Sequence, residues 1–382
     1  MRSQRFFITL AFSFLLLAGR AQTAQFNITY NSVPPALVTA FDHAADIWSQ
    51  LLMSSVPIKV NVSFYPLGAN ALGITFPNGR RDFPGAPYAD TWYASSLANS
   101  IAGVDLNPGE NDIDIFFSNG ANWYTDTSGT PGAGQHDFVS VALHELGHGL
   151  GFVGLSKKVG NQGSFGLLEM ADFFPLTTSF PWPELDTLPG IFDRFLSDQQ
   201  DGPLAMMPNP STVLGSAMTG NTLYFNGPIV MAMNGGQAPR IYAPGAFALG
   251  SSCVHLNEST YPVGNPNELM TPFSSAGSVN HDPGLICLWM LRDIGWNLAP
   301  GVGVEEARPA ASLSVVPNPA IDMITLTSTA PMWNEQLALI DAQGHIVRIV
   351  PITPTMDVRD LPPGAYVLRV VGSSQHWRFI KA

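Results

Sequence analysis

An apolar stretch that ends in two histidines constrains this chain more than any other feature. Residues 138–146 read F-V-S-V-A-L-H-E-L and lead through one H-E-x-x-H motif, formed by His144, Glu145 and His148. Positions i and i+4 lie on the same face of a helix, so both imidazoles can reach one metal ion. Glu145 then lies beside the metal, where its carboxylate can take a proton from a metal-bound water. Because most of this helix is apolar, we expect it to be buried.

The N-terminus has the features of a secretory signal. Arg2 and Arg5 give it positive charge, an apolar run of thirteen residues (6–18) follows, and small residues at 19–21 provide a cleavage site. We therefore predict that residues 1–21 are a signal peptide. Thirteen apolar residues are too few to span a bilayer, and we expect no membrane-spanning segment later in the chain.

Composition limits the domain count and the partners. The 382 residues suffice for two or three domains, and 46% hydrophobic with 12% charged residues supports a sizeable core. The formal charge is −12, and loss of three arginines with the signal peptide changes 17 minus 29 to 14 minus 29, or −15. An acidic chain with few lysines has no electrostatic footprint for nucleic acid or anionic lipid, so we expect neither partner.

The segment before the motif predicts a mixed α+β domain. Residues 35–53 carry apolar side chains at helical spacing, and residues 93–102 are consistent with a short helix. Residues 56–66 alternate with period two, as a half-buried strand does, and residues 112–118 are predicted to form a second strand. Residues 72–88 are rich in Gly, Pro and Arg, so we predict a loop there.

The rest of the chain predicts a long insertion, a helix and a separate β domain. Residues 152–250 have weak periodicity and form an insertion without an assigned fold, whereas residues 280–297 predict an apolar helix. Residues 298–311 resemble a linker. Residues 312–382 predict a small all-β, immunoglobulin-like sandwich. Its seven strands are expected at residues 312–316, 323–328, 336–340, 345–350, 356–358, 366–371 and 376–380.

The chain has two cysteines, Cys253 and Cys287. In an exported protein an even pair suggests a disulfide, which would tie the segment before His255 to the apolar run at 285–291. The alternative is two free thiols in the core, where unpaired cysteine is common.

Two histidines leave a catalytic zinc short of one protein ligand. The compact pattern H-E-x-x-H-x-x-G-x-x-H places a third histidine ten residues after the first. Gly151 fits this pattern, but the tenth position is Gly154, which has no side chain to bind a metal. Only His255 and His281 lie after the motif and before the β domain. We place His255 first, because a compact turn with a methionine follows it at residues 269–272.

These residues resemble the leishmanolysin-type metzincin metallopeptidases. The shared features are H-E-L-G-H-G-L-G-F, a long insertion, and a histidine followed within about fifteen residues by E-L-M-T-P. The resemblance covers roughly residues 22–296 and implies a metzincin-like catalytic domain, a mixed sheet with an active-site helix. This chain lacks the family's usual spacing and its dense cysteines, so the family's specificity is not carried over. The roles implied are zinc ligation by His144, His148 and His255, proton transfer by Glu145, and a methionine turn at Met270.

Glu169 is a rival third ligand. It lies in L-L-E-M-A-D-F-F, 21 residues after His148, about where thermolysin-like gluzincins place a glutamate ligand. Their glutamate usually belongs to an N-E-x-x-x-D pattern, whereas here Asp172 is at i+3 and no Asn precedes Glu169. His255, Glu169 and His281 therefore all stay candidates at this point.

The C-terminal residues resemble the type A sorting domain of cargo for the bacterial type IX secretion system. Three blocks carry the resemblance: V-P-N-P-A at 316–320, D-L-P-P-G-A-Y-V-L-R-V at 360–370 and F-I-K at 379–381. The resemblance implies export through the periplasm and across the outer membrane, with the type IX machinery as partner. It also implies removal of this domain and release or surface anchoring of the remainder.

We therefore predict a secreted zinc endopeptidase that cleaves protein or peptide substrates with a metal-activated water and Glu145 as general base. Strand 112–118 is expected to pair with the extended substrate, and Tyr261 is a candidate oxyanion donor. The alternative is a catalytically inactive cell-surface binding or adhesion protein with a protease-like domain. The intact motif argues against this alternative.

Overall fold

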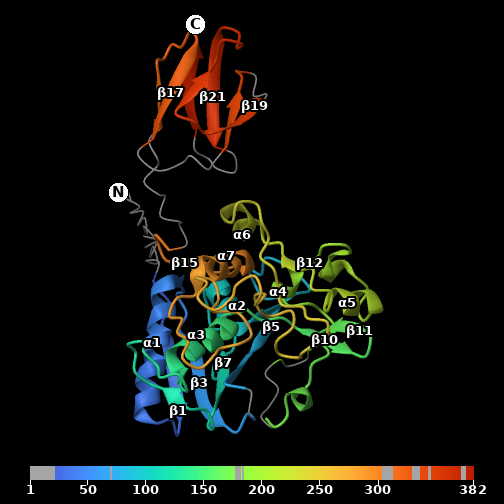
Figure 1. Cartoon of the computed structure of the whole chain (residues 1–382). Coiled ribbons are helices and arrows are strands. Elements are labelled where there is room, and N and C mark those ends of the chain that lie inside the picture. Colours follow the sequence, from blue (N-terminus) through green and yellow to red (C-terminus); the bar gives the residue numbers. More distant parts are fainter. Residues whose placement is uncertain are drawn as a thin grey trace, which may run out of the picture.

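The structure, a computed structural model, forms two units with separate cores (Figure 1). The larger core extends from Ala24 to Trp296 and the smaller one from Ala320 to Phe379. No helix in the described part of the chain has both the length and the apolarity needed to cross a membrane. The predicted signal peptide lies outside the described residues, which are 22–68, 71–176, 182, 185–302, 313–328, 336–342, 346–370 and 376–382.

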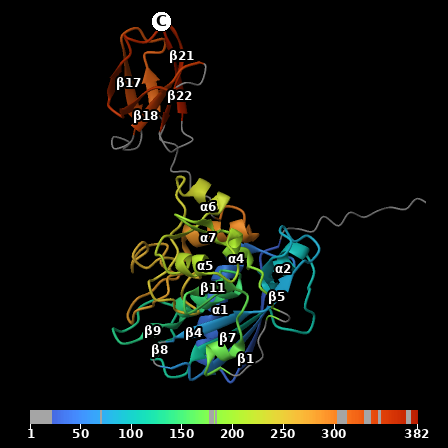
Figure 2. The ribbon, with the colours of Figure 1, turned by 90° about the vertical axis from the view of Figure 1, so that its right-hand side faces the viewer.

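A mixed four-stranded sheet is the largest described sheet of the first unit (Figures 1 and 2). Strands β1, β3 and β7 are parallel, whereas β4 is antiparallel to β7 and lies at the edge. In β3 the alternating side chains of Ile58, Val60 and Val62 face the core. In spatial order the strands are β1 (Phe26–Asn31), β3 (Ile58–Tyr65), β7 (Ile113–Ser118) and β4 (Gly73–Pro77).

Two long helices, α1 (Pro35–Leu51) and α3 (Phe138–Gly149), pack against each other and this sheet. Trp48 of α1 donates its indole N–H to the carbonyl of Leu143 in α3, at 2.9 Å inside the core. α3 carries the H-E-x-x-H motif and is buried over nearly its whole length, as its apolar sequence predicted. Asp137 caps its N-terminus by accepting a backbone N–H of the first turn at 2.8 Å.

Shorter elements complete the first unit. The predicted insertion packs into the first core, since Phe192, Leu196 and Phe225 belong to the same cluster as α3. The helices are α2 (Ser95–Ala102), α4 (Ile191–Arg194), α5 (Thr212–Ala217), α6 (Pro228–Met233) and α7 (Gly284–Ile294), with 3-10 turns at Met170–Phe173 and Leu204–Met206. The strands are β2 (Leu52–Met53), β5 (Gly79–Arg81), β6 (Trp92–Ala94), β8 (Trp123–Tyr124), β9 (His136–Asp137), β10 (Ser156–Val159), β11 (Gln162–Phe165), β12 (Leu196–Asp198), β13 (Gly202–Pro203), β14 (Leu223–Phe225) and β15 (Asn297–Leu298).

The prediction of a loop at residues 72–88 is wrong, because this segment contains β4 and β5. Between its terminal Gly73 and Pro77, β4 has only I-T-F, which is too short to show a period-two pattern. Pairing with β7 stabilises this strand, since strand formation depends more on neighbours than on intrinsic propensity.

The linker predicted at 298–311 starts too early. Leu298 pairs with Leu52, and the backbone N–H of Ala299 donates to the carbonyl of Leu51 at 2.9 Å. The first unit therefore continues past residue 298. Residues 303–311 of the predicted linker lie outside the described part of the chain.

The predicted disulfide is also wrong, because both cysteines are free and fully buried. Cys287 lies in α7, whereas Cys253 lies in a loop with its Sγ 3.8 Å from the carbonyl oxygen of Met218. Each packs as a small apolar side chain. An even number of cysteines does not ensure that their Cβ atoms face each other, which a disulfide requires.

The C-terminal unit consists of two antiparallel sheets around one core. The sheets have the orders β16-β17-β20 and β19-β18-β21-β22, and their inner faces share buried residues such as Ile324, Leu339 and Phe379. Each predicted strand range overlaps a strand, whereas the immunoglobulin-like topology stays a prediction. The strands are β16 (Leu313–Val316), β17 (Met323–Ser328), β18 (Gln336–Ile340), β19 (Ile346–Pro351), β20 (Thr355–Asp357), β21 (Gly364–Val370) and β22 (His376–Lys381).

The two thiols should react only after unfolding. Burial raises the pKa of both Cys253 and Cys287, so neither is a thiolate in the folded protein. We expect iodoacetamide to leave the folded full chain unlabelled and to add two labels after denaturation without reductant, as measured by intact mass. If labelling of the denatured protein required a reductant, the two cysteines would be bonded and the disulfide prediction would be right.

Candidate metal centre

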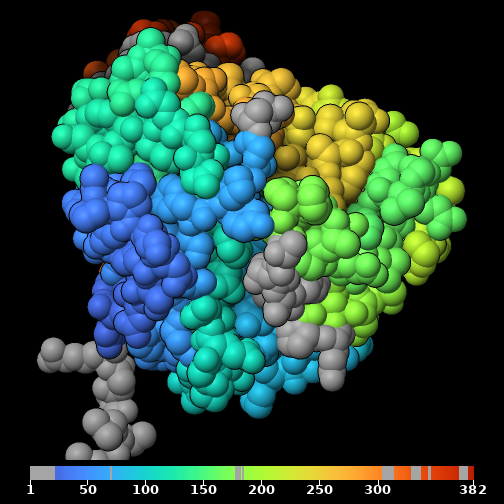
Figure 3. Space-filling model, turned by 90° about the horizontal axis from the view of Figure 1, so that it is seen from below, coloured from blue at the N-terminus to red at the C-terminus, as the bar shows by residue number. Residues whose placement is uncertain are grey.

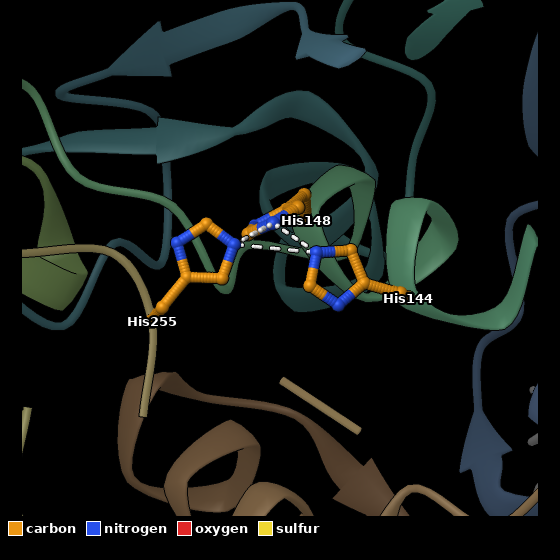
Figure 4. Close-up of side chains that lie close together, drawn as sticks. All are labelled: His144, His148 and His255. Atoms are coloured by element: carbon orange, nitrogen blue, oxygen red, sulfur yellow. Dashed lines mark hydrogen bonds between the residues drawn. The ribbon is translucent and has the colours of Figure 1, made fainter. Parts of the chain in front are cut away.

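Three histidine side chains converge on one point in the first unit (Figure 4). His144 and His148 come from successive turns of α3, and His255 comes from a loop beyond the insertion. Their Nε2 atoms are 3.0 Å apart between His144 and His148, 3.1 Å between His148 and His255, and 3.2 Å between His144 and His255. Zn–N bonds of about 2.0–2.1 Å in a tetrahedral site place ligand nitrogens roughly 3.3 Å apart. The triangle therefore has nearly the size of one face of a zinc site.

Backbone carbonyls set the tautomer of all three rings. In each ring Nδ1 lies within hydrogen-bond distance of a carbonyl oxygen, which can only accept, so Nδ1 carries the proton. Each Nε2 of a neutral ring is then a bare lone pair, and the contacts drawn in Figure 4 cannot be hydrogen bonds between these rings. Three lone pairs at this distance repel one another unless a cation lies between them. The acceptors are Leu269 for His144 at 2.7 Å, Phe152 for His148 at 2.6 Å and Ser251 for His255 at 2.9 Å.

Burial keeps these histidines neutral. It lowers the pKa of His144, and together with the nearby His144 it lowers the pKa of His148 to about 3. Burial and the other two imidazoles place the pKa of His255 well below its ordinary value. Neutral imidazole is the form that binds a metal, so these residues need no deprotonation at neutral pH.

Glu145 lies beside this cluster on α3 and lines the same cleft. Burial raises the pKa of its carboxyl to about 7, although a hydrogen bond from Thr75 opposes this shift. The Thr75 hydroxyl donates to Oε2 of Glu145 at 2.6 Å. Among the described residues no group donates to Oε1, so this oxygen is available to a water or substrate.

A buried turn that contains Met270 packs against α3 and contacts the segments that carry the three histidines. Met270 is fully buried, and its sulfur packs so closely on α3 that a Cβ added to Gly147 would lie 2.8 Å from it. The Met270 carbonyl accepts from the backbone N–H of Leu256 at 2.8 Å, next to His255. The neighbouring Leu269 supplies the carbonyl that orients His144. One turn therefore positions histidines from two distant parts of the chain.

A cleft of about 850 Å³ opens over the histidines and Glu145. Its lining comes from β4, from α3 and the segment after it, and from residues 249–280. Figure 3 shows the first unit from below, with the blue and teal first third of the chain on one side and the green and gold middle on the other. Leu155 and Trp182 form part of an apolar wall, and no lysine or arginine is among the described lining residues.

The other candidate residues lie elsewhere. Glu169 is exposed and caps a 3-10 turn, where its backbone N–H donates to Asp172 at 2.8 Å. Nε2 of His281 lies 2.7 Å from Oδ2 of Asp137 at the start of α3, so His281 is outside the histidine cluster. Tyr261 is buried in the main core and does not line the cleft, so the structure does not bring it to an oxyanion.

Strand β7 is an interior strand, so the prediction that it binds substrate is wrong. It pairs with β3 on one side and β4 on the other, so the edge strands of this sheet are β1 and β4, and of these two β4 lines the cleft. The sequence pattern does not identify Gly73 and Thr75 as site residues, because their segment is rich in Gly, Pro and Arg and resembles a loop. The signal was the i, i+2 spacing of a glycine and a hydroxyl residue, which places both on one face of a strand.

Comparison with known proteins identifies the C-terminal unit. Residues 314–380 match the secretion system C-terminal sorting domain, and this match does not extend into the first unit. The chain is therefore cargo of the type IX secretion system, exported to the cell surface or released, and the sorting domain implies contact with that machinery. No curated protein and no solved structure matches the chain.

Proposed function

We propose that the first unit is a secreted zinc-dependent endopeptidase. One observation carries the proposal: three neutral imidazoles direct their lone pairs at one point, next to a buried carboxylate, at an open cleft. A donor set of three histidines with an open fourth position is typical of catalytic zinc. This arrangement supports the metzincin-like resemblance, in which an insertion separates the third histidine from the motif.

The residues present fit a zinc ion. His144, His148 and His255 would hold it through Nε2, and their Nδ1–H bonds to backbone carbonyls would keep the rings in place. When bound, zinc supplies Lewis-acid polarisation of the scissile carbonyl and lowers the pKa of a bound water.

Glu145 is suited to move the proton. Its Oε2 accepts from Thr75, which leaves Oε1 to take a proton from the attacking water and to pass it to the leaving amine. Burial raises the pKa of this carboxyl above its ordinary value, so Glu145 can hold a transferred proton more readily than an exposed carboxyl.

The substrate is proposed to lie along β4 in place of β7. A peptide added to a free sheet edge gains backbone hydrogen bonds without sequence specificity. The apolar wall with Leu155 and Trp182 would accept apolar side chains, and the lack of lysine and arginine among the described lining residues disfavours acidic ones.

Zinc content tests the ligand set. We expect about one zinc per full chain in the wild type, loss of zinc in His255→Ala, and full retention in Glu169→Ala, because three nitrogen ligands are needed and Glu169 is remote. Plasma mass spectrometry of dialysed protein measures this, with circular dichroism to confirm folding. Zinc lost with Glu169 but kept without His255 would reject this ligand set.

The variant Glu145→Gln tests the mechanism. It keeps the shape of the side chain and the zinc but cannot take a proton, so casein cleavage should fall by about 10²- to 10⁴-fold. Glu169→Gln is the matched control and should cleave casein at the wild-type rate, since that residue is exposed outside the cleft. Wild-type activity should vanish with a chelator and return with zinc.

A folded, zinc-loaded wild type without peptidase activity would favour the alternative, an inactive surface binding protein. Near wild-type turnover in Glu145→Gln would instead keep an enzyme but reject Glu145 as its base.

A further inference from the structure

The edge strand β4 directs two residues at the proposed general base. Gly73 and Thr75 are at i and i+2, so both face the same side, toward α3. Thr75 donates to Oε2 of Glu145 at 2.6 Å. Gly73 lies against the same carboxylate, because a Cβ added there would be 2.5 Å from Oε1 and 2.8 Å from Cγ of Glu145. The Glu145 side chain is therefore held between one hydroxyl and one bare backbone position.

The same two residues turn their backbone groups to the free edge. In an antiparallel pair, hydrogen-bonded and non-hydrogen-bonded positions alternate. The backbone N–H of Ser118 donates to the carbonyl of Leu72 at 2.9 Å, and the backbone N–H of Asn78 donates to the carbonyl of Asp112 at 2.7 Å. The even-numbered residues of this strand therefore form the backbone hydrogen bonds to β7. The N–H and C=O groups of Gly73 and Thr75 then point away from β7. They are the groups that a peptide at this edge would bond.

We propose that Thr75 is a positioning residue that fixes the carboxylate of Glu145 from the substrate-binding strand. This inference rests on the proposed function. The backbone of Thr75 binds the substrate while its side chain orients the base, so one residue sets the distance between the scissile bond and the oxygen that moves the proton. A tight substrate contact thus also restricts the strand that holds Glu145, which favours a reactive geometry.

The substitution Thr75→Val separates the two roles. Valine has the shape of threonine and leaves the backbone groups in place, but it cannot donate to Glu145. Because hydrogen bonds to charged groups are the stronger ones, we expect kcat to fall about 10- to 100-fold. We expect KM to change by less than about twofold, since the lost interaction orients the base and does not bind the peptide.

Two further variants serve as controls. Thr75→Ser keeps the hydroxyl and should recover most of the wild-type kcat. Thr29→Val makes the same change on β1 of the same sheet, where the side chain is exposed, and should leave kcat and KM unchanged. Zinc content should stay at wild-type level in all three, because none of these residues belongs to the histidine cluster.

Gly73→Ala gives a second reading of the same geometry. The added methyl would collide with Oε1 and displace Glu145, so kcat should fall while zinc stays bound. The backbone φ of Gly73 is not in the left-handed region, so a loss of activity would reflect this contact and not backbone strain.

Binding of acetohydroxamate keeps the inference testable without turnover. A hydroxamate chelates zinc and shares a hydrogen bond with the neighbouring carboxylate, so Thr75→Val should weaken its binding about 5- to 20-fold. A wild type that binds zinc and hydroxamate but cleaves no peptide would defeat the proposed function, and the hydroxamate affinities would still decide the role of Thr75. Unchanged kcat and unchanged hydroxamate affinity in Thr75→Val would overturn the positioning role.

Discussion

The fixed tautomer of three buried histidines is the constraint on which the rest of the first unit depends. Each Nδ1–H is taken by one backbone carbonyl, so three separate segments must be held within hydrogen-bond distance of the rings. Leu269 belongs to the methionine turn, Phe152 to the chain after α3, and Ser251 to the loop before the third histidine. A shift of any one segment would rotate its imidazole and remove a lone pair from the cluster, since such outer contacts orient metal ligands.

The long insertion meets this constraint through backbone pairing near His255. Tyr242 donates to the carbonyl of His255 and Leu256 donates to the carbonyl of Met270, both at 2.8 Å. These two hydrogen bonds hold the backbone at His255 in place, although His255 lies 107 positions after His148. The insertion also shares the core of α3, so the segment that leads to His255 is packed against the rest of the first unit. Rigid support of this kind is what a preformed metal site requires.

Sequence patterns predicted the elements that carry their own periodicity. The motif helix and strands β3 and β7 follow from apolar spacing, and His255 was the first choice from its neighbouring methionine turn. Strand β4 escaped prediction because pairing with β7, and not its own three central residues, makes it a strand. Thr75 and Gly73 were missed with it. The choice between His255, Glu169 and His281 depends on contacts across about a hundred residues, which local patterns do not encode. The disulfide prediction was wrong for the same reason, because a bond between two cysteines depends on how their side chains face each other in the fold.

The proposed donor set suits the place to which the sorting domain sends this chain. Outside the cell, thiols oxidise, and a thiolate ligand would be vulnerable there. The cluster contains only imidazoles, and both cysteines are buried in the core outside it. Because burial already holds the three rings neutral, metal uptake would release few protons and would relieve the repulsion between their lone pairs. On the proposed assignment, zinc binding would stabilise the folded first unit through the same contacts that the proposed chemistry requires, while the second unit keeps its own core for sorting.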